Sequence, residues 1–519
     1  MLASEACMSA PASPSFPAPV RLESDEVERY LERLLAACAL AAAVVFIGVG
    51  IGRPVWLDEA NSVLIASHGF SGIIDSLSRD NNLPLYYFLL SGWMRVFGNS
   101  EIAVRSLSAI FYLGGCGAAF ALGKRLTGET RAGWYSAFFY EASALAILQA
   151  QNIRMYSLLG MLSGLSAWCW LRVIRDRDGS RGAWAWLLAV NSLGLLTHVW
   201  FVFVLGGQLA ATAVCERRQL GRFVLAGVAA AVPFSVLWGP VFWHQLHNGA
   251  TGWMPRLQPI FLILAGTEFY GPVASLLLFA LAGACAIYAV RKGCSMGIAP
   301  LVLIFLASVA VPLAISFVKP IYWPGRYLVI GAASLAAVLG SILAGAPSRL
   351  VPALAGLLLL GAQVPAQFAG RDLVPGSQLP PGQSDRTTAE FLLAHAAPGD
   401  AIVFTSLSRA AADYYFGRAG AGHRFQEFSF PADTATHLGW MDSSAPPERQ
   451  TRLEAEASWI AGQAGAIAGG GHAIWVYDGA SIRVTELLTR RLNLTLNPRA
   501  DYRLEGSYHK RILEYRTER

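Results

Sequence analysis

Acidic residues gather in a short segment between two long apolar runs, and they are the groups most able to do chemistry. Asp58 and Glu59 follow the first apolar run directly, and Asp75 and Asp80 come later in the same segment, 53–105. Ionisable groups this close to apolar runs are costly unless they face water or a polar cavity, so they are functional candidates. A carboxylate placed there can accept a proton from an attacking hydroxyl group.

Two interpretations of the acidic pair are open. In the first, Asp58 is a general base, and Glu59 orients it or holds an ion or an arginine. In the second, the pair caps an amphipathic helix expected over residues 60–67, since acidic groups favour helix N-termini. Asp75 and Asp80 flank a short polar stretch and are interpreted as solvated loop charges.

The composition defines the setting of this segment. Of the 519 residues, 54% are hydrophobic and only 14% are charged, and the mean hydropathy is +0.44. Such a chain is too apolar for water-soluble domains alone, and a membrane-spanning helix needs about 17–25 apolar residues. We therefore expect an α-helical membrane protein with about 11 spans. The expected spans are 34–52, 106–122, 132–148, 156–173, 183–198, 200–215, 223–241, 273–290, 298–318, 327–343 and 351–368.

Basic residues predict the orientation, because cytoplasmic loops are enriched in them. Lys and Arg cluster at every second connection, within 124–131, 172–181, 217–222 and 291–292 and at Arg349, and Arg residues also precede the first span. The N-terminus is therefore expected in the cytoplasm, and segment 53–105 and the residues after about 370 on the extracytoplasmic face. Topology alone accounts for the net charge of +6, without any nucleic acid. The first span is too long and starts too late for a cleaved signal peptide.

Three regions are expected along the chain. Residues 1–30 form a cytoplasmic tail whose first 20 residues, rich in Pro, Ala and Ser, are typical of disorder. Residues 31–368 form the membrane domain. Residues 369–519 begin with a Pro- and Gly-rich linker and form a small extracytoplasmic α/β domain with a largely parallel sheet. Its expected helices are 387–395, 410–416, 447–468 and 481–492, and its expected strands are 401–405, 473–477 and 512–515.

Cysteine usage narrows the chemistry and the compartment. None of the seven cysteines lies in segment 53–105 or after residue 369, so neither a disulfide framework nor a cysteine zinc site is available there. The sequence also lacks a P-loop, a dinucleotide-binding glycine motif and an HExxH motif. The missing cysteines and the Ala- and Gly-rich composition favour a bacterial inner membrane.

Polar residues at the ends of spans form a second set of candidates. Arg154, Tyr156 and Arg326 lie at expected extracytoplasmic ends, where topology does not favour positive charge, and Arg326 is the leading candidate for binding a phosphate. Arg105 either extends to the membrane interface or pairs with Glu59 or Asp58. His198, between two short spans, is either a structural pivot or part of a site.

The order of several short motifs resembles a known family. These motifs are Trp56-x-Asp58-Glu59, Pro84-Leu-Tyr86-Tyr87 with Phe97-Gly98, Ser100-Glu101-x-x-x-Arg105, Gln151-Asn-Ile-Arg154-Met-Tyr156 and Tyr322-Trp-Pro-Gly-Arg326-Tyr327. Together they look like the protein O-mannosyltransferase and lipid A aminoarabinose transferase group, glycosyltransferase family 39 of the GT-C superfamily, over roughly residues 30–345. Two departures stand out. Asn82-Leu83-Pro84 replaces the His-Pro-Pro or Lys-Pro-Pro of many relatives, and Met155 follows Arg154 where an Arg-Pro-Asp is common.

The resemblance implies a GT-C fold and an inverting transfer of a sugar from a polyprenyl-phosphate donor to a lipid, glycan or protein acceptor. It implies Asp58 and Glu59 as catalytic residues. No organic cofactor is expected, whereas a divalent metal is possible. The residues expected to bind the donor phosphate or the substrate are Tyr86, Arg105, Arg154, Tyr156, His198, Arg326 and Tyr327.

Two other classes share some of these features. A transporter or lipid flippase also has many spans and buried charges, but such proteins tend to show internal repeats, and none is evident in the sequence. A non-catalytic sensor could use the α/β domain to bind a ligand, which would leave the acidic segment without a role.

The alternation of basic connections makes the topology testable. Reporter fusions at Arg175 and Asp400 should report opposite sides of the membrane, because Arg175 lies within a basic connection and Asp400 lies after the last span. Reporters that locate both positions on the same side would overturn this topology.

Overall fold

The computed structural model describes residues 24–175, 180–247, 254, 256–292, 297–368, 384–432, 447–479, 482–504 and 511–517. The chain divides into two compact units. The first holds Met1–Gly52, Leu83–Leu89 and Ile102–Gln378, and the second holds Arg53–Asn82, Leu90–Glu101 and Leu379–Arg519. Packing thus groups most of the acidic segment with the C-terminal domain. Residues 1–23 of the expected tail 1–30 and the linker at 375–382 lie outside the described residues, whereas residues 24–30 belong to the first helix.

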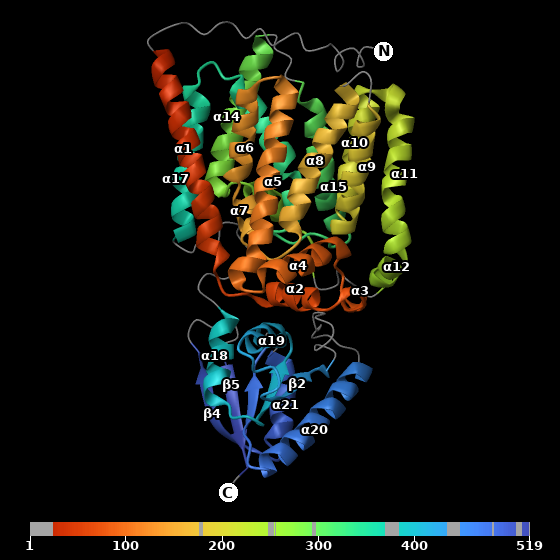
Figure 1. Ribbon diagram of the computed structural model, residues 1–519, viewed down its shortest axis with the longest axis vertical. Coiled ribbons are helices and arrows are strands. Elements are labelled where there is room, and N and C mark those ends of the chain that lie inside the picture. Colours follow the sequence, from red (N-terminus) through yellow and green to blue (C-terminus); the bar gives the residue numbers. More distant parts are fainter. Residues whose placement is uncertain are drawn as a thin grey trace. The chain divides into compact units, whose positions relative to one another are not determined.

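The first unit is a bundle of helices (Figure 1). Most of its helices correspond to expected spans, although the first begins ten residues earlier than expected and several are shorter than a span. They are α1 (Ser24–Ile51), α5 (Glu101–Thr127), α6 (Thr130–Glu141), α7 (Ala144–Ala150), α8 (Tyr156–Arg175), α9 (Arg181–Thr197), α10 (Phe201–Cys215), α11 (Leu220–Leu237), α12 (Gly239–His247), α13 (Ile260–Thr267), α14 (Pro272–Arg291), α15 (Ala299–Ser316), α16 (Ala332–Ala344) and α17 (Leu350–Phe368).

Seven helical segments among the described residues are long and apolar enough to cross a membrane. Two further apolar helices, Phe201–Cys215 and Leu350–Pro365, are shorter. The polytopic α-helical fold is therefore confirmed, whereas the expected number of 11 spans stays a prediction.

The third expected span, 132–148, is not one helix but two. It is broken between α6 and α7, where the Ser143 hydroxyl accepts a hydrogen bond from Ala146 N at 3.4 Å and so caps α7. Ser143 Oγ and Ala144 N also donate to the Phe269 carbonyl at 2.9 and 2.8 Å. The sequence carries Glu141 and Ser143 at the break, but a tertiary partner is needed to satisfy the freed backbone groups.

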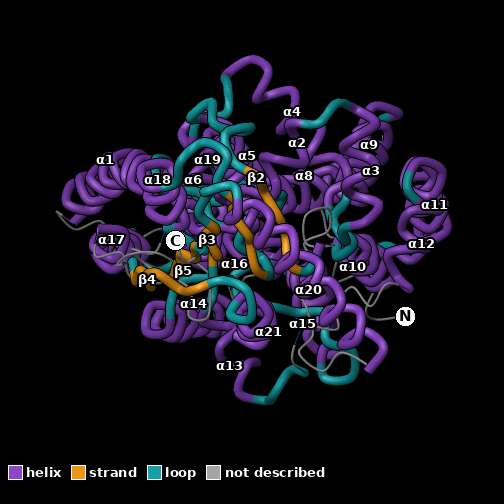
Figure 2. Tube along the Cα trace, turned by 90° about the horizontal axis from the view of Figure 1, so that it is seen from below, coloured by secondary structure: helices purple, strands orange, loops and turns teal. Residues whose placement is uncertain are grey.

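Helix α16 lies at the centre of the bundle, and all of its residues are buried. It packs on α6, where Gly340 faces Ser136 so closely that a Cβ on Gly340 would lie 2.5 Å from Ser136 N. Small residues at helix contacts are typical of membrane bundles, since close approach increases van der Waals contact. At the rim, α1 and α17 lie side by side, and α11 lies on the opposite side (Figure 2).

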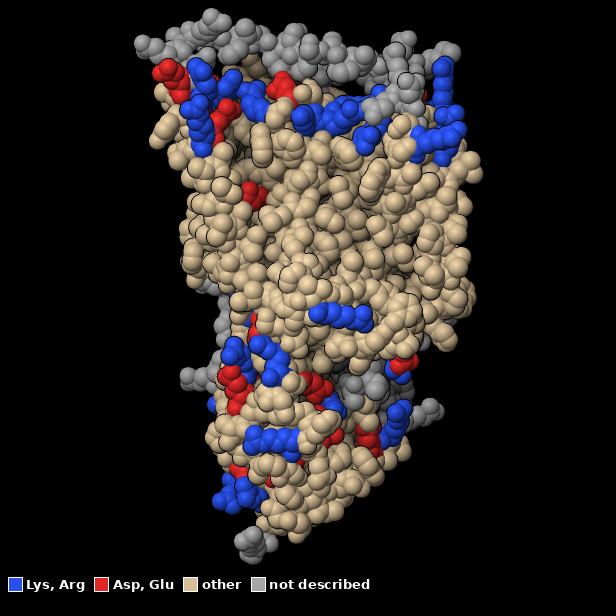
Figure 3. Space-filling model, in the orientation of Figure 1, with Lys and Arg blue, Asp and Glu red and all other residues tan. Residues whose placement is uncertain are grey.

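Basic side chains gather at one end of this unit, where α1 begins (Figure 3). There Arg131 donates to the Ala344 carbonyl at 2.7 Å, Arg175 donates to the Leu126 carbonyl at 3.1 Å, and Arg349 pairs with Glu32 at 3.5 Å. Because α8 runs from Tyr156 to Arg175, its first residue lies at the opposite end of the bundle. This distribution is the one that the positive-inside rule predicts.

The second unit combines the acidic segment with an α/β domain. The segment forms α2 (Leu57–Ser67), α3 (Phe70–Arg79) and the later part of α4 (Pro84–Phe97). The domain contains α18 (Asp385–His395), α19 (Arg409–Arg418), α20 (Pro447–Gly469) and α21 (Ile482–Leu492). Its strands are β1 (Ala401–Thr405), β2 (Gln426–Phe430), β3 (Ile474–Tyr477), β4 (Asn497–Arg503) and β5 (Arg511–Arg516).

The five strands form one mixed sheet in the order β2-β1-β3-β5-β4. Strand β1 pairs in parallel with β2 and β3, so that Val403 lies opposite Phe428 and Val476. Strand β5 is antiparallel to β3 and β4. The sheet is therefore less parallel than expected, because the predicted strand β5 is antiparallel to β3 and pairs with a further strand, β4, that was not predicted. Its residues are mostly exposed and carry no apolar alternation.

The alternation along β1 and β3 separates the two faces of the sheet. Val403 and Val476 lie in one buried cluster with residues of α20 and α21. On the other face, the rings of Phe404 and Trp475 contact Phe416 of α19 and Phe391 of α18. Helices thus cover both faces of the parallel part of the sheet, as buried strands require.

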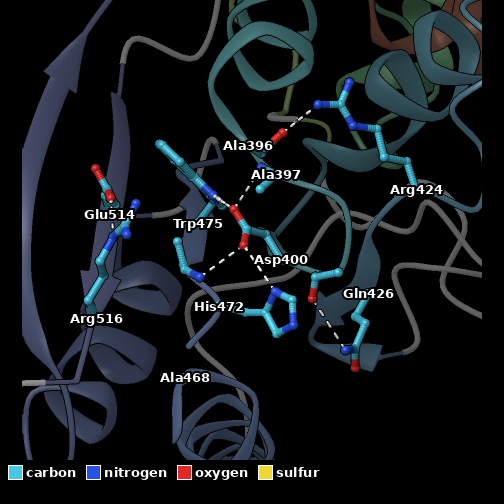
Figure 4. A network of polar contacts seen from close by, with 12 residues as sticks. Ala396, Ala397, Asp400, Arg424, Gln426, Ala468, His472, Trp475, Glu514 and Arg516 are labelled. Carbon is cyan, nitrogen blue, oxygen red and sulfur yellow. Dashed lines mark hydrogen bonds and ion pairs between the residues drawn. The ribbon is translucent and has the colours of Figure 1, made fainter. Parts of the chain in front are cut away.

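A buried carboxylate fastens the beginnings of β1 and β3 (Figure 4). Asp400 accepts hydrogen bonds from Ala473 N at 3.0 Å, Trp475 Nε1 at 2.9 Å and Ala397 N at 2.9 Å. The turn expected before this strand is present, with Gly399 at a φ of +89°, a conformation that glycine adopts readily. Asp400 thus has a structural role.

Candidate active site

The acidic pair lies at the first turn of α2. Trp56 is the N-cap residue, and its backbone N–H donates to Glu59 Oε2 at 3.3 Å. Glu59 is buried and Asp58 is half-buried. The cap predicted as the alternative role of the pair is thus present for Glu59. Asp58 lies in the same first turn of α2.

Several of the predicted residues of the helix bundle come together in one aromatic cluster. The rings of Tyr156, His198 and Tyr327 lie with their centroids 5.3–5.9 Å apart. Trp200 stacks on Tyr327 at 4.9 Å. His198 Nδ1 accepts a hydrogen bond from Trp200 N at 3.1 Å, so the proton of the neutral imidazole belongs on Nε2. The cluster combines hydroxyl and imidazole donors at the end of the bundle opposite the basic end.

Two arginines border this cluster. Arg154, 7% exposed, and Arg326, 9% exposed, both act electrostatically on the Tyr327 hydroxyl. Arg154 Nη1 also lies 3.5 Å from the Tyr87 hydroxyl. Buried guanidinium groups at one place create a positive potential that suits an anion, and their planar geometry matches phosphate.

The turn before Arg326 is held by a buried carboxyl that the sequence analysis missed. Glu268 is only 1% exposed, and its side chain accepts hydrogen bonds from the Tyr322 hydroxyl and, at 3.0 Å, from Gly325 N. Gln149 Nε2 donates to the Gly325 carbonyl at 2.5 Å. Gly325 has a φ of +75°, which a residue with a Cβ adopts rarely. The N–H and the carbonyl of Gly325 are therefore both hydrogen-bonded, which fixes the backbone directly before Arg326.

The surroundings of Glu268 change its acid–base behaviour. Burial raises the pKa of Glu268 from 4.5 to about 8, although the hydrogen bonds from Tyr322 and Gly325 act in the opposite direction. At neutral pH the carboxyl is therefore largely protonated while its oxygens still accept hydrogen bonds. It thus adds little negative charge next to the turn that leads to Arg326. An acidic residue just before α14 in the sequence is the signal that could have revealed it.

The segment around Glu268 is tied to other parts of the bundle as well. The Phe269 carbonyl accepts the bonds from Ser143 and Ala144, and the Tyr270 carbonyl accepts one from Gln363 Nε2 of α17 at 2.9 Å. Three consecutive residues therefore bind three separate segments of the chain.

The remaining predicted residues lie outside the aromatic cluster. Arg105 is buried, and Arg105 Nη1 donates to the Ile51 carbonyl at the end of α1, at 3.3 Å. Tyr86 is buried, and its ring contacts Tyr87 edge to face at 5.8 Å. The expected pairing of Arg105 with Asp58 or Glu59 stays a prediction, as does the assignment of all these residues to a site.

The part of the chain that the structure describes contains no group of three or more His, Cys, Asp and Glu side chains that could hold a metal ion. The participation of a divalent metal stays a prediction. The candidate site residues of the chain supply arginine, tyrosine and carboxyl groups.

The resemblance drawn from the motifs is confirmed by a family model that matches part of the chain and by solved structures that share its fold. Residues 81–243 match the family described as dolichyl-phosphate-mannose-protein mannosyltransferase. This region includes Tyr86, Arg105, Arg154, Tyr156 and His198. No curated protein sequence matches the chain.

Solved structures share the fold at low sequence identity. The crystal structure of ArnT from Cupriavidus metallidurans bound to undecaprenyl phosphate is 13% identical, covers 95% of this chain and 98% of its own, and has a TM-score of 0.60. The oligosaccharyltransferase of Archaeoglobus fulgidus in the apo form is 10% identical over 93% of this chain and 74% of its own, with a TM-score of 0.52. The archaeal oligosaccharyltransferase AglB from Archaeoglobus fulgidus in complex with an inhibitory peptide and a dolichol-phosphate is 11% identical over 94% and 74%, with a TM-score of 0.50.

The buried carboxyl at Glu268 can be tested through stability. Glu268→Leu keeps about the same size of side chain but has no acceptor, so the Tyr322 hydroxyl and the Gly325 N–H both lose their partner. A buried donor without an acceptor costs about 1–3 kcal/mol. We expect a lower thermal unfolding temperature of the purified protein in detergent. Glu129→Leu, the same change at a partly exposed residue, is the control, and equal unfolding temperatures for the two variants would contradict the prediction.

Proposed function

We propose that the chain is a membrane glycosyltransferase that moves a sugar from a polyprenyl-phosphate donor to an acceptor on the extracytoplasmic face, with inversion at the anomeric carbon. The observation that carries this proposal is the cluster of Arg154, Arg326, Tyr156 and Tyr327 at the end of the bundle opposite the basic rim. Its support is the shared fold with a transferase bound to undecaprenyl phosphate.

The two arginines are assigned to the phosphate of the donor. The prenyl chain of such a donor stays in the bilayer, so the protein needs no nucleotide-binding domain. When the bond from the sugar to the phosphate breaks, its electron pair leaves with the phosphate, which gains negative charge. Guanidinium and tyrosine hydroxyl donors held in place by Glu268 and by their ring contacts stabilise that charge without reorganising.

Asp58 is assigned as the general base. The acceptor hydroxyl attacks the anomeric carbon while the Asp58 carboxylate takes its proton, and the sugar–phosphate bond breaks on the opposite side. One displacement of this kind inverts the configuration. Glu59, whose carboxylate accepts the Trp56 N–H, is assigned to positioning: it fixes the first turn of α2, on which Asp58 lies.

The same proposal includes the setting. The basic rim is assigned to the cytoplasmic side of a bacterial inner membrane, and the α/β domain to the opposite side. The acceptor is a lipid, a glycan or a protein, and the donor is one of the polyprenyl-phosphate sugars.

A direct test follows the product. Purified protein is incubated with a panel of polyprenyl-phosphate sugars and an acceptor extract, and the release of free polyprenyl phosphate is measured. A transferase releases it from at least one donor. A flippase or transporter would move the donor between leaflets with the sugar attached, and a sensor would bind a ligand without any release, so either outcome would overturn the proposal.

The role of Asp58 gives a quantitative prediction. Asp58→Asn keeps the shape of the side chain but cannot accept a proton, and general-base catalysis contributes about 10²–10⁴-fold. We expect the rate of polyprenyl phosphate release to fall by that factor while the protein stays folded. Asp75→Asn is the matched control, because Asp75 lies in the same segment, exposed and paired with Arg79. An Asp58→Asn variant with more than about half of the activity would exclude this residue as the base.

The role of Arg326 is tested by binding. Arg326→Ala should weaken the affinity for polyprenyl phosphate itself, and Arg326→Lys should restore it only in part, because an ammonium group lacks the bidentate geometry. Titration of the lipid phosphate onto purified protein measures both. The control is Arg349→Ala at the other end of the bundle. If Arg326 only anchors the chain at the membrane interface, lysine will replace it fully and the affinity of the alanine variant will be unchanged.

A further inference from the structure

The acidic segment, residues 53–105, contacts one helix of the C-terminal domain, α19. Val55 is fully buried, and its backbone N–H donates to the Tyr415 hydroxyl of α19 at 2.9 Å. Val55 directly precedes Trp56, the residue that begins α2. Helix α19 also packs along α2. One hydroxyl group more than 350 residues away in the sequence therefore fixes the start of the helix that carries Asp58.

The other end of the segment is held by the same helix. The Tyr414 hydroxyl donates to the Asn99 carbonyl at 2.8 Å, and Arg418 forms an ion pair with Glu101. The Arg418 guanidinium also lies over the Tyr414 ring, 5.7 Å from its centre. Residues 414 and 418 are one helical turn apart, so they share one side of α19.

The helix that makes these contacts is itself rigidly seated. Arg409, at its start, pairs with Asp413 at 3.0 Å and with Glu427 of β2 at 2.9 Å. Phe416 packs against Phe404 of β1. Helix α19 is thus anchored to the sheet on one side and bonded to both ends of the acidic segment on the other.

We infer that the C-terminal domain is a positioning element of the transferase: α19, through Tyr415, Tyr414 and Arg418, holds the acidic segment so that Asp58 keeps its catalytic orientation. This inference rests on the proposed function, in which Asp58 is the base. The contacts lie at the two ends of the segment, at Val55 and at Asn99 and Glu101. A displacement of about 1 Å at a catalytic group can lower the rate by about 100-fold, so a backbone bond three residues before Asp58 has a measurable effect.

Tyr415→Phe is the sharpest test, because it removes one hydroxyl group and keeps the ring that packs in the domain. We expect kcat to fall by about 10-fold to 100-fold with little change in the KM for the donor. Hydrogen exchange of the backbone amides near residues 55–60 should become faster, because the Val55 N–H loses its acceptor and the first turn of α2 opens more often.

Tyr502→Phe is the matched control. It is the same chemical change in the same domain, and its hydroxyl donates to Glu514 of β5 from the edge strand β4, at the opposite end of the strand order from β2. It should leave kcat and the exchange of residues 55–60 unchanged. As a second variant, Arg418→Ala should raise exchange near residues 99–101 and lower kcat, and Arg418→Lys should recover part of both because it keeps the charge opposite Glu101.

The outcomes separate the two proposals. Unchanged exchange at residues 55–60 in Tyr415→Phe would overturn the contact, and faster exchange with an unchanged kcat would overturn its positioning role. An inactive Asp58→Asn beside a fully active Tyr415→Phe would refute this inference and leave the proposed function intact. An Asp58→Asn variant as active as the native chain would instead remove Asp58 from the mechanism. The contacts of α19 with the acidic segment would then have no catalytic group to position.

Discussion

The candidate site depends on how a non-helical turn in an apolar bundle satisfies its backbone groups. Within a membrane protein a free N–H or carbonyl costs several kcal/mol, so irregular backbone persists only where side chains or other segments bind it. Glu268 and Gln149 provide this for the Gly325 peptide. Without them the two backbone polar groups of Gly325 would lack partners, and the backbone that positions Arg326 beside the Tyr156, His198 and Tyr327 rings would not be fixed.

Much of this architecture follows from local sequence, and the parts that do not follow depend on distant partners. The apolar runs and the basic connections predict a helical membrane fold because length and charge act locally. The strand at β1 was predicted with its observed bounds because five successive buried residues leave few alternatives. The break between α6 and α7 was not, because the Ala144 N–H that it frees is bound by the Phe269 carbonyl, which is distant in the sequence. Strands β2 and β4 were missed because they are edge strands with exposed residues.

The candidate residues show the same division. Arg154, Tyr156, Arg326 and Tyr327 were chosen because their positions conflict with the expected distribution of charge or because they belong to shared motifs, and the structure brings them into one cluster with His198. Glu268 is an acid beside an apolar helix, which is unusual, but no motif surrounds it. Its partners Tyr322 and Gly325 are more than 50 residues away, and no local pattern encodes such a contact. The hydrogen bond from Val55 to Tyr415 of α19 could not be predicted either, since a single contact between distant residues leaves no pattern in the sequence.

The short stretch from Glu268 to Tyr270 has a consequence for how the sequence can change over time. Its side chain and carbonyls bind the turn at Gly325, the start of α7 and the middle of α17. A one-residue insertion or deletion there would shift at least two of these bonds out of register together, and no single substitution elsewhere could repair both. Three partners therefore fix the number of residues between α13 and α14. Homologues that keep this arrangement should differ in the residues around the stretch rather than in its length.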